Sequence, residues 1–148
     1  MKISRKRKKW LKKHNQYIRE RDTWCLEQTI AEYVYPRLVL FKKLNNGFPG
    51  YGDMDTPEKW DEAIDNMILA FQYMAEGDSW DDKPEFNYID HLVSYTEELP
   101  DGTKKYKTNL TDVGEEIRQH MIEESNRRQE AIEKGLSIYA KWHGYLWW

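Results

Sequence analysis

Cysteine and long hydrophobic runs are what this sequence has least of. A single cysteine, Cys25, excludes an internal disulfide and favours a reducing, intracellular setting. No run of about 18 apolar residues occurs, which excludes a transmembrane helix. No apolar segment follows the basic N-terminus, which argues against a signal peptide. We therefore expect a cytoplasmic protein that does not contact a membrane.

Motifs for catalysis and phosphate binding are missing too. The chain has no Walker A loop and no GxGxxG, and in GFPGYG (47–52) a proline and aromatic residues separate the glycines. None of the four histidines lies at metal-pair spacing from another or beside the cysteine. We therefore expect no catalytic residues and no cofactor.

The core must be built from few but large side chains. The 148 residues suffice for one domain, and only 39% of them are apolar, whereas 14% are aromatic. Each aromatic side chain can bury about 150–250 Å². This aromatic content also excludes a disordered chain.

Charge divides the sequence into a basic arm, residues 1–21, and an acidic domain, residues 22–148. The arm holds ten Lys and Arg and one acidic residue, Glu20, a net charge of +9. Because the whole chain carries −3, the remainder carries −12. The arm can bind a polyanion or fold against the acidic domain, and total charge leaves both open.

Aromatic residues within the arm add to the first of these interpretations. Positive charge together with Trp10 and Tyr17 provides the elements of single-strand nucleic-acid recognition. The candidate contacts are Lys6, Arg7, Lys8, Lys9 and Trp10.

Apolar residues at helical spacing predict helices in the first half of the chain. One begins near Lys8, and a second, with Asp22 or Thr23 as its N-cap, ends near Leu44 and Asn45. Pro36 in the middle of the second predicts a kink, or two helices that meet at Tyr35. A third helix, 57–75, follows Thr56 as N-cap and has proline in its first turn.

In the second half of the chain the spacing of apolar residues changes twice. Residues 76–92 are acidic and irregular, and then a Pro-Asp-Gly turn joins two threonine- and tyrosine-containing strands. Glu97 and Glu98 on one strand are expected to face Lys104 and Lys105 on the other. From residue 112 to the end the apolar spacing predicts one long helix, broken near Gly135 or projecting toward a partner. The predicted fold class is therefore mainly α, a small helical bundle with a short β-hairpin insertion near residues 93–108.

Three of the seven tryptophans lie in the last seven residues of the terminal stretch IYAKWHGYLWW. Such a tail can pack in the core, form a subunit interface or stack on a ligand, and core packing is favoured. We expect a homo-oligomer in which these rings are buried within or between protomers.

A pocket for a phosphorylated nucleotide needs fork-shaped donors for the phosphate and flat rings for the base. Arg37, Arg127 and Arg128 are the candidate phosphate contacts, and Tyr51 and Trp60 are the candidate stacking residues.

A weaker pattern concerns carboxylates. All-α nucleotide pyrophosphohydrolases hold Mg²⁺ with carboxylates from two helices, because a hard cation prefers oxygen ligands. The candidates here are Glu62, Asp65, Glu115 and Glu116. A solvated helix face explains the same pattern and is favoured, since acidic residues are routine in first turns.

Three stretches carry a family resemblance: LEQTIAEYVYPRLVLFKKLNNGFP, WDEAIDNMILAFQYMAEG and EKGLSIYAKWHGYLWW. They combine a Pro-Arg-Leu step, a Gly-x-Pro loop, a Trp-led helix and a Leu-Trp tail, carried by Pro36, Arg37, Leu38, Gly47, Pro49, Trp60, Met67, Phe71, Leu146 and Trp147. In this combination the chain resembles a group of small, uncharacterised bacteriophage proteins. The resemblance implies a phage origin, and hence the cytoplasm of a host cell, and a mainly helical fold. It implies no chemistry.

Small phage proteins without catalytic motifs often act by binding. By that analogy we expect a non-enzymatic counter-defence protein that sequesters a nucleotide-type immune signal. Association with nucleic acid through the basic arm is one alternative, and a Mg²⁺-dependent all-α nucleotide pyrophosphohydrolase is another. A structural role in the virion also stays open.

Overall fold

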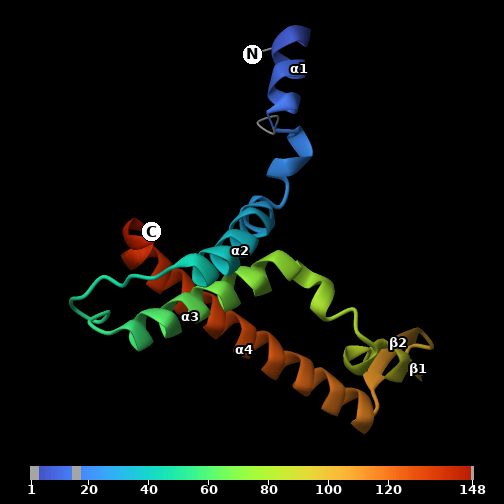
Figure 1. Cartoon of the computed structure of the whole chain (residues 1–148). Helices are drawn as coiled ribbons and strands as arrows, with labels where there is room; N and C mark the ends of the chain where they lie inside the picture. Colours follow the sequence, from blue (N-terminus) through green and yellow to red (C-terminus); the bar gives the residue numbers. More distant parts are fainter. Residues whose placement is uncertain (1–3, 15–17, 148) are drawn as a thin grey trace.

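The computed structural model describes residues 4–14 and 18–147 and is mainly α-helical with one β-hairpin, as predicted (Figure 1). The α-helices are α1 (Arg5–Lys13), α2 (Leu26–Leu44), α3 (Pro57–Glu76) and α4 (Asp112–Trp142). The strands are β1 (Leu92–Glu98) and β2 (Lys104–Leu110). Short 3₁₀ helices lie between these elements: η1 (Glu20–Thr23), η2 (Gly77–Trp80), η3 (Pro84–Phe86), η4 (Ile89–His91) and η5 (His143–Tyr145).

Helices α2, α3 and α4 form the body, and α3 packs against both of the others (Figure 1). The Gln28 side chain at the start of α2 donates to the carbonyl of Ala75 at the end of α3, 3.1 Å away. The Phe71 ring, late in α3, lies 5.1 Å from the Tyr139 ring, late in α4, whereas Trp60, early in α3, meets Trp142. Helices α2 and α4 therefore both run antiparallel to α3.

The core lies along α3, as its apolar period predicts. Ile64, Met67 and Ala70 on α3 are fully buried, and Ala31 on α2 is as well. Trp142 is 3% exposed, so this part of the aromatic tail packs within the protomer.

The start of α3 follows its predicted chemistry. The Thr56 hydroxyl accepts the backbone N–H of Lys59 at 3.3 Å, and Pro57 occupies the first turn, where its missing N–H leaves no bond unmade. The predicted range 57–75 agrees with the observed Pro57–Glu76.

Helix α2 differs from the prediction at two points. It continues through Pro36 as one helix, so the alternative of two helices meeting at Tyr35 is wrong. It also begins at Leu26 with Cys25 as its N-cap, so the predicted caps Asp22 and Thr23 are wrong. The physical reason is local. The Asp22 carboxylate accepts the backbone N–H of Arg19 at 2.7 Å and so stabilises η1. The first turn of α2 therefore has no side-chain cap hydrogen bond.

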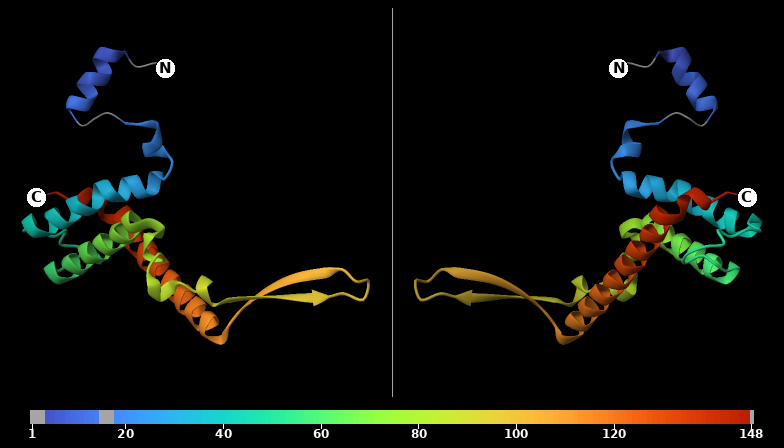
Figure 2. Two further views of the ribbon diagram at one scale, coloured as in Figure 1. Left: turned by 90° about the vertical axis from the view of Figure 1, so that its right-hand side faces the viewer. Right: turned by 90° about the vertical axis from the view of Figure 1, so that its left-hand side faces the viewer.

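Helix α4 is unbroken through Gly135 and ends at Trp142, where η5 takes over. The alternative of a break near Gly135 is therefore wrong. The first half of α4 extends beyond the body to the base of the hairpin, which projects from the rest of the molecule (Figure 2).

The hairpin was predicted over residues 93–108 and spans 92–110. Its register places Glu97 opposite Lys105 and Glu98 opposite Lys104, which confirms the expected pairing. Gly102 in the turn has φ +82°, a conformation that glycine adopts without strain. Both faces of the two strands are largely exposed to solvent.

Candidate functional site

Helix α1 concentrates positive charge on a short rod. Seven of its nine residues are Lys or Arg, and none of the nine is buried. Ser4 provides the N-cap by accepting the backbone N–H of Arg7 at 3.3 Å. In Figures 1 and 2 this helix stands apart from the three-helix body. The predicted contacts Lys6, Arg7, Lys8, Lys9 and Trp10 all lie on it.

The aromatic residue of α1 is held from within its own segment. The Trp10 ring stacks on the His14 ring with 4.2 Å between centroids, and the His14 side chain also bonds the Trp10 carbonyl. Trp10 remains 52% exposed. One ring face is therefore supported by His14 while much of the indole stays in contact with solvent. Tyr17, the second aromatic residue of the predicted arm, lies outside the described residues.

Five of the seven basic side chains of α1 form no ion pair with the described residues of the acidic body. Among the described residues, Arg5, Lys6, Arg7, Lys9 and Lys13 form no ion pair with a carboxylate. The ion pairs of the described body join other groups, for example Lys42 to Asp65 and Lys141 to Asp53.

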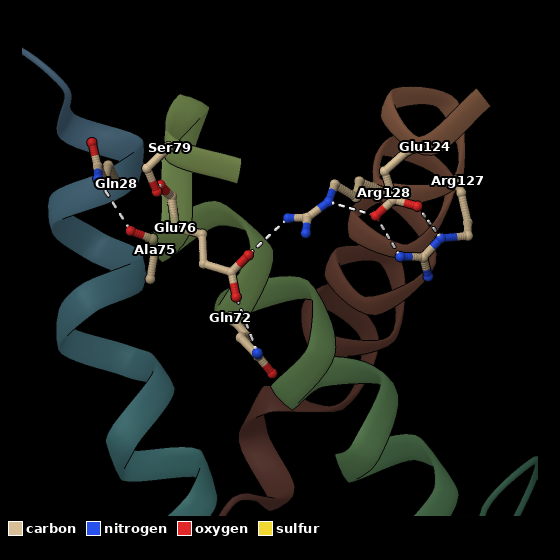
Figure 3. A network of polar contacts seen from close by, with 8 residues as sticks. All are labelled: Gln28, Gln72, Ala75, Glu76, Ser79, Glu124, Arg127 and Arg128. Carbon is tan, nitrogen blue, oxygen red and sulfur yellow. Dashed lines mark hydrogen bonds and ion pairs between the residues drawn. The ribbon is translucent and has the colours of Figure 1, made fainter. Parts of the chain in front are cut away.

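A second cluster of arginines lies where α3 ends beside α4 (Figure 3). Arg128 is buried and donates from Nη1 to Glu76 and from Nε to Glu124, each at 2.8 Å. Arg127 donates two further hydrogen bonds to Glu124, at 2.7 and 2.6 Å. The Arg128 guanidinium also lies 4.4 Å from the centroid of the Tyr73 ring. The cluster ties the end of α3 to the middle of α4.

The charges within this cluster are mutually compensated. The hydrogen bonds from Arg127 and then Arg128 lower the pKa of Glu124 from 4.5 to about 2, against the effect of burial. Burial raises the pKa of Glu76, but the bonds from Arg128 and Gln72 outweigh it and the net shift is downward. Both carboxylates are therefore ionised at neutral pH, and a phosphate would have to compete with them for the guanidinium groups.

The remaining nucleotide candidates lie elsewhere. Arg37 is on α2. Its guanidinium lies 3.5 Å from the centroid of the Tyr33 ring, one turn earlier on the same helix, and donates a hydrogen bond to the Tyr33 carbonyl. It lines a hollow with Tyr139 and Leu146, whereas Arg128 lines another with Tyr73 and Trp80. The structure thus brings Arg127 and Arg128 together and leaves Arg37 apart.

The two predicted stacking residues, Tyr51 and Trp60, both contact the ring of Trp142. Trp60 is 2% exposed and packs edge-on against Trp142, so its faces are covered by the core. Tyr51 lies 5.5 Å from the same Trp142 ring and shares a hydrogen bond with the Tyr145 hydroxyl. Tyr51 is exposed at the surface, but the arginine cluster with Tyr73 is at the other end of α3.

The carboxylates proposed for Mg²⁺ separate into two places. Glu62 and Asp65 lie on α3, where Asp65 accepts a hydrogen bond from Lys42. Glu115 and Glu116 open α4, and Arg118 binds Glu115 and lowers its pKa to about 2. Helix α4 contacts α3 near Glu62 and Asp65 at Gly135, which packs against Asn66. Glu115 and Glu116 lie about 20 residues earlier on α4, so roughly 30 Å of helix separates the two pairs. The described residues contain no group of three or more side chains suited to a metal ion.

One surface was not recognised from the sequence. The outer face of α2 exposes large apolar side chains in a row, at spacings that alternate between four and three: Leu26, Ile30, Tyr33, Leu40 and Leu44, with Arg37 at the intervening position. We call this row the α2 seam. The alternation is readable in the sequence, but the inner apolar residues of the same helix mask it until burial separates the two faces.

Comparison with known proteins returns nothing: no protein-family model, curated protein or solved structure matches the chain. The resemblance to phage proteins therefore stays a prediction. No helix in the described ranges combines the length and the apolar character needed to cross a membrane.

Proposed function

We propose that this protein is a non-enzymatic binding protein that contacts nucleic acid through α1. The observation that carries the proposal is a nine-residue helix with seven basic residues that stands apart from an acidic body. Folding against the body would have joined α1 to acidic side chains there, and five of its basic residues have no such partner among the described carboxylates.

Electrostatics explains why a helix of this kind binds a polyanion. Nine residues span about 14 Å, and duplex DNA carries one charge per ≈ 1.7 Å of its axis, so several phosphates lie within reach of α1. Each neutralised phosphate releases counterions, which makes the affinity fall as salt rises. Such binding does not depend on sequence, since phosphate contacts position a protein without reading bases.

An anionic membrane is the other common target of a basic amphipathic helix. Helices that insert into a headgroup layer bury a broad apolar face. Only Trp10 and Leu11 are apolar in α1, and Trp10 is already stacked on His14. This small apolar area favours nucleic acid over lipid.

Salt titration with matched variants tests the proposal. The full chain is titrated against a 20-nucleotide single strand and a duplex of equal length at salt concentrations from about 50 to 200 mM. The test variant carries Lys6→Gln, Arg7→Gln, Lys9→Gln and Lys13→Gln. The control removes the same charge from outside α1, with Lys83→Gln before η3, Lys104→Gln and Lys105→Gln on the hairpin, and Lys134→Gln on α4.

The two variants separate local contact from net charge. The α1 variant is expected to lose at least about tenfold in affinity at low salt, with a salt slope shallower by about 0.9 per lost duplex contact. The control is expected to lose much less. Equal losses in both variants would show that only the overall charge matters, and stronger binding to anionic vesicles than to nucleic acid would overturn the choice of partner.

Nucleotide sequestration in phage counter-defence is the second candidate. The observation that favours it is the Arg128 guanidinium, 4.4 and 5.0 Å from the ring centroids of Tyr73 and Trp80 in a hollow also lined by Ser125. The two carboxylates on Arg128 weigh against it. Calorimetric titration with cyclic dinucleotides, followed by recovery of the ligand, tests it: stoichiometric binding with intact recovery supports capture, and absent heat or hydrolysed product contradicts it.

A further inference from the structure

Helix α2 has two apolar faces, and the body uses only one of them. Ala31, Leu38 and Phe41 are buried against the rest of the body. The α2 seam lies on the other face, and its five apolar residues are between 46% (Ile30) and 62% (Tyr33) exposed. A contiguous exposed apolar row of this length on a soluble domain marks an interaction surface.

The spacing of the seam is that of a coiled coil. Its six positions are separated by four, three, four, three and four residues, the a and d positions of a heptad repeat. A surface helix that packs on its own domain has a broader stripe, like the inner face of α2. The seam therefore fits another helix of the same period.

We propose that this helix is α2 of a second copy, paired antiparallel across a two-fold axis at the level of Tyr35. In that register the position numbers of facing residues add to 70. Leu26 meets Leu44 of the second copy, Ile30 meets its Leu40, and Tyr33 meets its Arg37. Each layer pairs an a with a d position, and the contact is self-complementary as a two-fold interface requires.

Charge selects the antiparallel direction. The exposed charges of α2 are acidic in its first half, at Glu27 and Glu32, and basic in its second half, at Arg37 and Lys43. Antiparallel pairing sets the acidic half of one copy beside the basic half of the other and opposes the two helix dipoles. Parallel pairing would place like charges together.

Arg37 at the centre of the seam fits the same arrangement. Its guanidinium already donates to the Tyr33 carbonyl at 2.6 Å and covers the Tyr33 ring. Two copies would place two such Arg37–Tyr33 pairs side by side, where a polar residue at an a position fixes register. Four seam residues also line a hollow of about 460 Å³ together with Tyr139 and Leu146, so the apolar surface continues from the seam toward the end of α4.

Oligomeric state tests the pairing. Sedimentation equilibrium of the full chain across a wide concentration range is expected to show a monomer–dimer equilibrium. Ile30→Gln with Leu40→Gln keeps helix propensity and places four amides in the dimer, so the dissociation constant should rise at least about 100-fold. The control, Tyr106→Gln, removes a 79% exposed apolar side chain from the hairpin and should leave the equilibrium unchanged.

Two outcomes would overturn the proposal. A chain that is monomeric at every concentration has no such interface. A dimer that survives the seam variant but is lost with Tyr106→Gln pairs through the hairpin. Circular dichroism of both variants establishes that the helices remain.

Crosslinking tests the direction independently. In a Cys25→Ser background, Leu26→Cys and Leu44→Cys proteins are oxidised separately and as an equimolar mixture. Antiparallel pairing predicts disulfide dimers in the mixture alone, because identical positions lie about 27 Å apart along the helix pair. Dimers from each variant by itself would establish parallel pairing, and no dimers in any sample would contradict the seam.

Discussion

Gly135 of α4 lies against Ala70 of α3 so closely that a β-carbon on Gly135 would stand 2.4 Å from the Ala70 Cβ. The same atom would lie 2.3 Å from the backbone carbonyl oxygen of Asn66. Real β-carbons do not approach other atoms this closely, so the two helices can cross here only because residue 135 has none. The crossing fixes α4 to the core and leaves its first half free to carry the hairpin outward.

Gly135→Ala is therefore expected to destabilise the fold even though alanine is the better helix former. Alanine gains about 1 kcal/mol of helix propensity, but the helices must separate, and overpacking of this kind costs about 1–3 kcal/mol or more. A net loss of about 1–2 kcal/mol should appear in urea unfolding. Gly144→Ala is the control, since nothing lies within 4 Å of a β-carbon there. Equal effects of the two substitutions would contradict the close crossing.

Gly135 also shows which features of the fold could not be predicted from the sequence. In the sequence, a glycine in a long helical pattern is either a break or a packing position, and only the facing residues decide between them. The boundaries of α3 and the register of the hairpin were predictable, because Thr56–Pro57 and Pro-Asp-Gly are local signals. The start of α2 was not, since Asp22 is a good N-cap that happens to bond Arg19.

Arg128 gives a second prediction, because it is buried between two carboxylates while its neighbour is exposed. Arg128→Met leaves Glu76 and Glu124 without their shared partner in a partly buried place. It should cost about 2–4 kcal/mol of unfolding free energy. Arg127→Met removes a side chain that is 56% exposed and should cost less than about 1 kcal/mol. Thermal and urea unfolding of the two variants measure the difference, and an Arg128→Met protein as stable as the natural one would contradict the structural role.

The pKa of Glu124 predicts how stability responds to acid. Its folded-state pKa of about 2 lies below the ordinary 4.5, so on acidification the unfolded chain takes up the proton first. The stabilisation is complete above about pH 5 and is lost as the pH falls toward 2. Glu124→Gln should flatten this part of the pH profile of the unfolding free energy. Glu130→Gln, which removes an exposed carboxylate of the same helix, is the charge-matched control, and identical profiles for the two variants would contradict the assignment.

Candidate sites within one short segment could be predicted from the sequence, whereas sites that depend on contacts between distant segments could not. The basic helix α1 could be predicted because charge and Trp10 lie within one short segment. The nucleotide pocket could not be evaluated, because a sequence does not show that Glu76 and Glu124 meet Arg128, or that Arg37 and Arg128 line separate hollows. The α2 seam was hidden because both faces of one helix are apolar, and only burial tells them apart.

The seam and α1 together predict how affinity depends on strand length. A dimer paired through α2 carries two α1 helices, and a strand long enough to reach both gains from their effective concentration. The Ile30→Gln, Leu40→Gln variant should therefore lose at least about tenfold in affinity for a 40-nucleotide strand. Its affinity for an 8-nucleotide strand, which one α1 covers, should stay within about twofold, because α1 itself is unchanged. Fluorescence anisotropy at constant salt measures both, with Tyr106→Gln as the control. An equal loss on both strands would mean that the seam residues affect α1 directly, and no loss on either would mean that each α1 binds alone.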